Sequence, residues 1–250
     1  MPFIPTAALD HVSECWNDRH WIGRAALSPE NSAERVLNLL TDPALHWPYL
    51  TLVQSSTQPA LREFTTPIPG YRQRAIDLER LRNLVDQGYT MKFQRVEDFD
   101  STVRAGVAEL QAHFGLATTA YAFVTPTESQ GLSFHRDASH VVAFQLQGHK
   151  EWEIVHPARS ANPNAGLEPD PKGERFTFVL SPGDLLYLPH GWPHRARTTS
   201  ERSTHLTFTI SRPQPYALAS QLLTAGRRMP GYVAADAEAI AVAAIAQLGL

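Results

Sequence analysis

Between Thr125 and Asp137 the chain reads TPTESQGLSFHRD. The proline, serine and glycine of this segment separate one short β-type run from the next, which ends at His135-Arg136-Asp137. In a strand, residues i and i+2 face the same side. The imidazole of His135 and the carboxylate of Asp137 are therefore expected to point together into one space.

Short segments rich in β-branched and aromatic residues continue on both sides of this motif. Expected strands, separated by Pro, Gly and Asn, cover residues 120–125, 132–137, 141–146, 151–155, 176–180, 184–188 and 205–210. Many short strands with turn signals between them predict a sandwich or barrel. Residues 158–174 are rich in Pro, Asn and Gly and read as a surface loop.

Helical patterns flank these strands on both sides. Expected helices cover residues 33–40, 76–87 and 102–114, and two more follow Pro215. The sequence therefore predicts an α+β fold with a mainly helical flank that includes some strands, a β core and C-terminal helices, at residues 1–115, 116–213 and 214–250. The apolar face of residues 234–248 suits a homodimer contact or packing back on the barrel equally well.

Length and composition fit an ordinary globular protein. At 250 residues, 43% of them hydrophobic, the chain is long enough for one domain, or one domain with a small appendage. The net charge of -3 argues against broad binding to nucleic acid. Cys15 is the only cysteine, so neither an internal disulfide nor a cysteine-rich zinc site is expected. No apolar stretch is long enough to span a membrane, and a cytoplasmic location is expected.

A second histidine can complete a metal site with His135 and Asp137. His194 follows the expected strand GDLLYLP, residues 183–189, and a short turn. Two histidines and one carboxylate on one face of a metal form the facial triad of non-haem Fe(II) oxygenases. An isolated H-x-D is common by chance, and a histidine such as His205 can simply belong to the core. The joint context, with a β-rich segment between the ligands, favours the metal site.

Lys150 adds a fourth element, because it lies at the hairpin turn before the expected strand 151–155. An inward-facing lysine there could pair with a carboxylate. The alternative is an exposed hairpin lysine.

Four motifs occur in order along the β-rich part of the chain. They are TPTESQGLSFHRD at 125–137, FQLQGHKEW at 144–152, PGDLLYLP at 182–189 followed by His194, and STHLTFT at 203–209. On these motifs, residues 88–211 resemble the JmjC-type cupins of the ribosomal oxygenase group, which hydroxylate side chains of ribosomal proteins. The resemblance implies a double-stranded β-helix, the jelly-roll barrel of cupins, as the core of the fold.

The resemblance also implies a set of cofactors and ligands. Fe(II) would be held by His135, Asp137 and His194, with 2-oxoglutarate and O2 as cosubstrates. Lys150 would bind the distal carboxylate of 2-oxoglutarate, and Thr209 would lie beside it. Where the group has Asn-x-Tyr, this chain has Tyr121-Ala122-Phe123, so the contacts in the cosubstrate pocket are expected to be rearranged. Tyr121 can offer a hydrogen bond of its own, and Phe123 cannot.

The expected activity is hydroxylation of an amino-acid side chain in a peptide or protein, or of a free amino acid or natural-product intermediate. Only about forty residues follow Ser211, so the winged helix of the ribosomal enzymes is not expected here. Their ribosomal substrate is therefore not assigned to this chain. Residues expected to line the substrate pocket are His140, Phe144, Trp192 and Phe123. Two alternatives stay open: a metal-binding cupin with isomerase or cofactor-independent dioxygenase activity, and a non-catalytic binding module.

Overall fold

A computed structural model describes residues 3–26, 33–157 and 164–211. Contacts among the residues of Met1–Ser211 make this segment a single compact unit. The expected C-terminal helices at 214–250, and with them the expected dimer contact, lie outside the described residues. So does most of the first half of the expected loop at 158–174.

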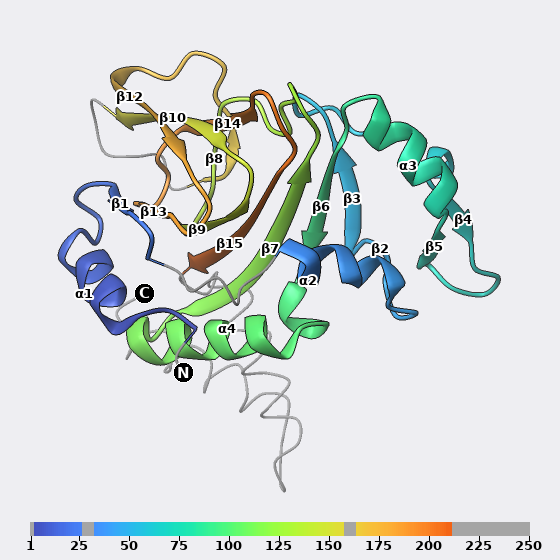
Figure 1. Ribbon diagram of the computed structural model, residues 1–250, viewed down its shortest axis with the longest axis horizontal. Helices are drawn as coiled ribbons and strands as arrows, with labels where there is room; N and C mark the ends of the chain where they lie inside the picture. The colour runs from blue at the N-terminus through green and yellow to red at the C-terminus, as the bar shows by residue number, and fades with distance from the viewer. Residues whose placement is uncertain (1–2, 27–32, 158–163, 212–250) are drawn as a thin grey trace, which may run out of the picture. The chain divides into compact units, whose positions relative to one another are not determined.

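Two antiparallel β-sheets form the core of this unit (Figure 1). The larger sheet contains, in spatial order, β1 (Trp21–Gly23), β13 (Leu185–Leu188), β9 (His140–Gln147), β15 (Ser203–Ser211), β7 (Ala117–Thr125), β6 (Thr90–Gln94) and β3 (Leu50–Val53). The smaller sheet contains β11 (Gly166–Leu167), β8 (His135–Arg136), β14 (His194–Thr198), β10 (Lys150–Pro157) and β12 (Gly173–Leu180). A separate three-stranded sheet contains β2 (His46–Trp47), β5 (Arg74–Ile76) and β4 (Thr65–Pro67).

The chain passes repeatedly between the two main sheets. From β7 onward, β7, β9, β13 and β15 lie in the larger sheet, whereas β8, β10, β12 and β14 lie in the smaller one. This exchange is the double-stranded β-helix, and the α+β jelly-roll prediction is confirmed. Six of the expected strands are present, but the one at 132–137 is reduced to β8, and β14 was not expected.

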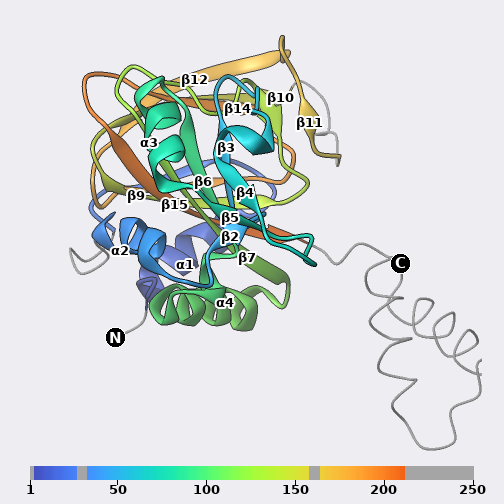
Figure 2. The same ribbon diagram turned by 90° about the vertical axis from the view of Figure 1, so that its right-hand side faces the viewer.

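The residues before β7 supply both helices and strands. The helices are α1 (Thr6–Glu14), α2 (Ala33–Asn38), α3 (Leu78–Asp86) and α4 (Ser101–Phe114), with short 3-10 turns at Leu39–Thr41, Leu61–Glu63 and Val96–Asp98. The side chain of Asp100 caps α4 by accepting hydrogen bonds from the backbone N–H groups of Thr102 and Val103. Figure 2 shows α4 running beneath β7, on the outer side of the larger sheet. No helix among the described residues is long and apolar enough to cross a membrane.

Strand alternation gives the larger sheet two different faces. Along β15, Leu206, Phe208 and Ile210 belong to the apolar core shared with the N-terminal segment and α4. The alternate residues, from His205 onward, face the space between the two sheets. One face of the sheet therefore stabilises the fold, and the other forms a wall of a cavity.

His140 and Phe144, expected in the substrate pocket, lie on the outer face of the larger sheet. The ring of His140 stacks on Trp16 at 3.7 Å between centroids, and Phe144 makes an edge contact with Phe208 at 5.7 Å. The cause is the alternation of side chains along β9. Val141 faces the cavity, so His140 and Phe144, at odd spacing from it, face the opposite side of the sheet. The prediction of these two residues as pocket lining is therefore corrected.

A core substitution tests this placement. Phe144→Ala is expected to lower the free energy of unfolding by about 3–5 kcal/mol, because it leaves a cavity among fully buried side chains. Urea denaturation measures the loss, and Val179→Ala, at a 43% exposed position on β12, is the near-neutral control. A loss below about 1 kcal/mol would contradict the packing described here.

Candidate functional site

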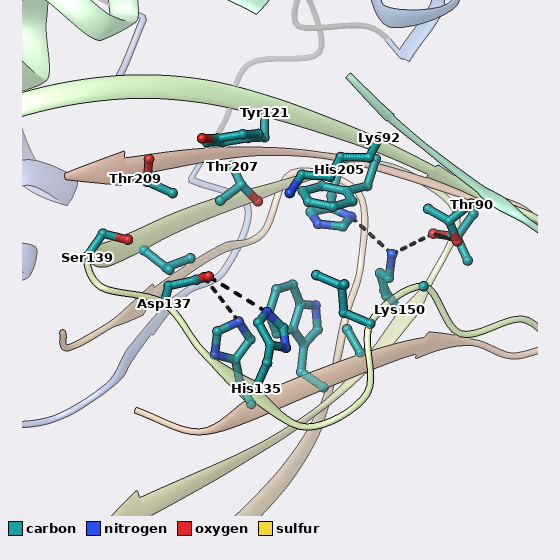
Figure 3. Close-up of a pocket in the computed structure, with 18 of the residues that line it drawn as sticks. Thr90, Lys92, Tyr121, His135, Asp137, Ser139, Lys150, His205, Thr207 and Thr209 are labelled. Atoms are coloured by element: carbon teal, nitrogen blue, oxygen red, sulfur yellow. Dashed lines mark hydrogen bonds and ion pairs between the residues drawn. The ribbon is translucent and has the colours of Figure 1, made fainter. Parts of the chain in front are cut away.

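A cavity of about 330 Å³ lies between the two main sheets (Figure 3). Its walls come from β6, β7, β9 and β15 of the larger sheet and from β8, β10 and β14 of the smaller one. The volume falls in the range of pockets that hold small molecules. The expected metal-binding residues, Lys150 and Tyr121 all line this one space.

His135, Asp137 and His194 converge at one side of the cavity. β8 and β14 pair directly through His135 and His194, and Asp137 follows β8 by one residue. Asp137 places one carboxylate oxygen 3.9 Å from Nε2 of His135 and the other 3.6 Å from Nε2 of His194. The possible ligand atoms of the three residues all lie within 4.8 Å of one another. In the part of the chain that the structure describes, this is the one group of three or more such residues found close enough to hold a metal ion.

Backbone carbonyls fix both imidazole rings. Nδ1 of His135 donates to the carbonyl of Ser133 at 2.9 Å, and Nδ1 of His194 donates to the carbonyl of Trp192 at 3.0 Å. When such a ring is neutral, with its proton on Nδ1, its Nε2 lone pair is directed toward Asp137. Burial, reinforced by His194, lowers the pKa of His135 to about 4, so this imidazole is neutral at physiological pH. A neutral ring held in this orientation is what a divalent metal needs.

The donor set fits a particular kind of metal. Two imidazole nitrogens and one carboxylate oxygen, without a thiolate, form the triad that suits Fe(II) and leaves coordination positions open. The three side chains therefore fit the metal that the sequence predicted.

Lys150 lies at the enclosed end of the cavity and is only 3% exposed. Its ammonium donates to Oγ1 of Thr125 at 2.9 Å and to Nδ1 of His205 at 3.2 Å. Burial lowers the pKa of Lys150 to about 7, and burial together with Lys150 keeps the pKa of His205 well below its usual value. An ammonium has three donors, so one is left for a carboxylate in the cavity.

The other expected cosubstrate contacts are distributed differently. Tyr121, Phe123 and Thr209 all line the cavity, as expected. Thr209, however, is four residues beyond His205 along an extended strand, roughly 13 Å away, and does not lie beside Lys150. Thr125 is the hydroxyl that contacts the Lys150 ammonium, so the expected place of Thr209 is corrected.

Trp192 contributes its backbone to the site rather than its ring. Its carbonyl orients His194, while its indole stacks on His156 at 4.7 Å with an angle of 11° between the rings. The indole therefore belongs to the apolar cluster behind the cavity and does not line it. Trp152, which the same cluster includes, does reach the cavity.

Several cavity residues were not expected from the sequence. They are Thr90, Lys92, Thr125, Ser139, His205 and Thr207. The polar-apolar alternation of STHLTFTIS in β15 is a signal that could have identified His205 and Thr207. Lys92 is half-buried over the ring of Tyr121, 5.0 Å from its centroid; burial lowers the pKa of Lys92, and Asp137 opposes that shift.

Curated proteins with similar sequences are oxygenases. Ribosomal oxygenase 2 of Rattus norvegicus is 32% identical over 136 residues, which cover 54% of this chain and 29% of that protein. Ribosomal oxygenase 1 of Homo sapiens is 33% identical over 136 residues, 51% of this chain and 21% of that protein. The bifunctional lysine-specific demethylase and histidyl-hydroxylase NO66 of Drosophila persimilis is 31% identical over 135 residues, 52% of this chain and 20% of that protein. The matched region thus spans less than a third of the length of these relatives.

Solved structures show the same fold. The X-ray structure of ycfD from E. coli superposes with a TM-score of 0.62 at 17% identity, over 93% of this chain and 61% of that chain. A second structure of YcfD, a ribosomal oxygenase from Escherichia coli, superposes with a TM-score of 0.55 at 15% identity, over 98% of this chain and 67% of that chain. The model of the JmjC domain matches residues 94–218, half of the chain. This protein belongs to the JmjC domain family.

Proposed function

We propose that this protein is an Fe(II)- and 2-oxoglutarate-dependent oxygenase that hydroxylates an amino-acid side chain. His135, Asp137 and His194 hold the iron. Lys150 binds the distal carboxylate of 2-oxoglutarate, and Thr125 and His205 hold Lys150 in place. The proposal rests chiefly on the two Nε2 atoms and the carboxylate that converge in the same cavity as an enclosed lysine.

The relatives support the same chemistry. Their names describe ribosomal oxygenases and a histidyl-hydroxylase, and YcfD has been solved with cobalt and 2-oxoglutarate. We extend from these names to this chain the oxidation of a protein or peptide side chain. Because the chain matches only a fraction of each relative, the ribosomal substrate itself is not carried over.

The iron and 2-oxoglutarate together supply dioxygen activation, in which 2-oxoglutarate becomes succinate and carbon dioxide and one oxygen atom enters a substrate C–H bond. The chain's own residues bind and orient. The carbonyls of Ser133 and Trp192 keep Nε2 of each histidine directed at the metal position. Trp152 and Val141 form an apolar part of the cavity wall and exclude water from the metal position.

The state of Lys150 makes 2-oxoglutarate binding depend on pH. In the free protein the amine is largely neutral above a pKa of about 7, so binding a carboxylate there requires uptake of a proton. The dissociation constant of 2-oxoglutarate is therefore expected to rise by about tenfold per pH unit above about pH 7. Calorimetric titration of 2-oxoglutarate into the zinc-loaded protein at a series of pH values measures this constant. Affinity that stays constant up to about pH 9 would show that Lys150 does not pair with this carboxylate.

The proposed activity is tested by turnover of the purified protein. With Fe(II), 2-oxoglutarate and oxygen, we expect succinate to form, and omission of either the metal or 2-oxoglutarate should stop it. Candidate substrates should increase the rate and gain one oxygen atom by mass spectrometry. A protein that binds the metal but neither binds nor consumes 2-oxoglutarate would favour an isomerase, a cofactor-independent dioxygenase or a binding module.

A further inference from the structure

Lysine is used very selectively in this chain. Of its 22 basic Lys and Arg residues, only Lys92, Lys150 and Lys172 are lysines. Two of the three line the cavity, whereas Lys172 lies on the surface with its side chain 80% exposed. No arginine lines the cavity among the described residues. The proposed function uses Lys150 and leaves Lys92 without a role.

Lys92 lies across the cavity from the two imidazoles. It is on β6 of the larger sheet, whereas His135 and His194 are on the smaller sheet. β6 and β7 pair Lys92 with Phe123, and its ammonium lies 5.8 Å from the Phe123 ring centroid and 5.0 Å from that of Tyr121. Figure 3 shows Lys92, Tyr121 and Thr207 together on this wall.

The ammonium of Lys92 has no hydrogen bond or ion pair with any residue in the described ranges. The two aromatic faces stabilise its charge, and Asp137 acts on it only at longer range. A half-buried ammonium retains three donors, and charged groups away from water favour an ionic partner. Thr207, beside Lys92 in Figure 3, and Thr209 and Ser139, farther along the cavity, add hydroxyl groups that can donate to an oxygen-rich ligand.

The formal charges of the loaded site show which partner is missing. In the proposed function the two positive charges of Fe(II) are matched by the two negative charges of 2-oxoglutarate. Among the charged side chains that line the cavity, Asp137 then offsets one of the two lysines, Lys92 and Lys150. One positive charge remains, on the wall that faces the metal position. A single carboxylate on the substrate would neutralise it.

We propose that Lys92 binds a carboxylate of the substrate, so that the oxygenase acts on an acidic compound rather than on a basic side chain. This inference rests on the proposed function. The carboxylate can belong to an aspartate or glutamate side chain within a peptide, or it can be the terminal carboxylate of an amino acid. An arginine or lysine side chain would meet Lys92 as a like charge.

Binding to the loaded but unreactive protein tests the inference. The protein is loaded with Zn(II), which undergoes no redox chemistry, and with 2-oxoglutarate, and probes are titrated by calorimetry. N-acetyl-aspartate amide and N-acetyl-glutamate amide are compared with their asparagine and glutamine counterparts. N-acetyl-alanine is compared with N-acetyl-alanine amide to test a terminal carboxylate. We expect at least one acid to bind about tenfold more tightly than its neutral counterpart, and the preferred pair identifies the source of the carboxylate.

Variants assign the preference to Lys92. Lys92→Met, which keeps the aliphatic length, is expected to remove the preference for the acid, and Lys92→Arg is expected to retain it. Lys172→Met is the matched control at the exposed lysine, and it should bind as the wild type does. Equal binding of acids and neutral counterparts would overturn the inference, as would an unchanged preference in Lys92→Met. Loss of 2-oxoglutarate binding in Lys92→Met would also overturn it, by assigning Lys92 to the cosubstrate.

The two proposals can fail separately. If the wild-type protein loaded with Zn(II) does not bind 2-oxoglutarate, the proposed function fails before any probe is added. If 2-oxoglutarate binds and the acids show no preference, only the inference about Lys92 fails.

Discussion

Asp137→Ala is expected to abolish iron binding and 2-oxoglutarate turnover together. Asp137 offers the only carboxylate of the triad, so its loss leaves two imidazoles to hold a divalent cation. Loss of a group that merely orients a metal ligand lowers affinity by about 10–100-fold, and loss of a ligand should exceed that range. Calorimetric titration with Mn(II) and a succinate assay measure the two effects.

The fold should survive this substitution. The Asp137 side chain is 35% exposed, and its close polar contacts are the two imidazoles. Thermal unfolding of the metal-free variant is therefore expected to match that of the wild type. Asp170→Ala, at a carboxylate that is 71% exposed on the surface, is the control and should bind metal normally. An Asp137→Ala variant with wild-type metal affinity would refute the ligand assignment.

Lys150→Met is expected to weaken 2-oxoglutarate binding by at least about a hundredfold at pH 7 or below. The reason is that the variant leaves the distal carboxylate buried without its cation, and an unpaired buried charge costs about 3–5 kcal/mol. Metal binding should remain, because Lys150 contacts Thr125 and His205 and none of the triad. The dissociation constant of 2-oxoglutarate, measured with the metal bound, checks the effect.

The stability of the free protein provides a second measurement on the same variant. The folded state keeps the amine of Lys150 away from water and lowers its pKa to about 7, so between about pH 7 and its ordinary pKa the unfolded chain binds the extra proton. Protonating the unfolded chain reduces stability as pH falls through that window. The Lys150→Met variant has no amine to protonate and does not lose stability in this way. The free energy of unfolding of the variant at neutral pH should therefore equal or exceed that of the wild type. Lys172→Met is the control for loss of a lysine, and a Lys150→Met variant that keeps full 2-oxoglutarate affinity would contradict the assignment.

Local patterns were sufficient to bring His135, Asp137, His194 and Lys150 together in one cavity. His135 and Asp137 are two positions apart, and His194 follows a strand and a turn, so spacing and order carried the information. The hairpin between β9 and β10 likewise turns Lys150 inward, where its side chain is almost fully buried. These features depend on short-range geometry that a sequence preserves.

The remaining pocket residues depend on which face of a strand points inward. The turn between β8 and β9 interrupts the alternation, so the inward direction of Asp137 does not determine that of His140 or Phe144. Lys92 was not predicted as a cavity residue for a different reason. β6 reaches the cavity only through its pairing with β7, a long-range contact that local pattern does not reveal.

The two proposals assign Lys150 to the cosubstrate and Lys92 to the substrate. Lys150 is enclosed by its partners Thr125 and His205, which suits a cosubstrate that binds in every cycle. Lys92 lies on the opposite sheet from the triad histidines, beside Tyr121 and Phe123, where this chain departs from the Asn-x-Tyr pattern of the ribosomal oxygenase group. The altered strand and Lys92 thus lie together, which is why we expect a substrate unlike that of the ribosomal enzymes.

Anaerobic titration of 2-oxoglutarate into the protein, with and without Fe(II), tests the central proposal most directly. We expect one 2-oxoglutarate to bind per chain, tightly only when Fe(II) is present, and this binding to be lost in both Asp137→Ala and Lys150→Met. A wild-type protein that holds Fe(II) and does not bind 2-oxoglutarate, or that binds it equally well without His135, Asp137 and His194, would contradict the proposal.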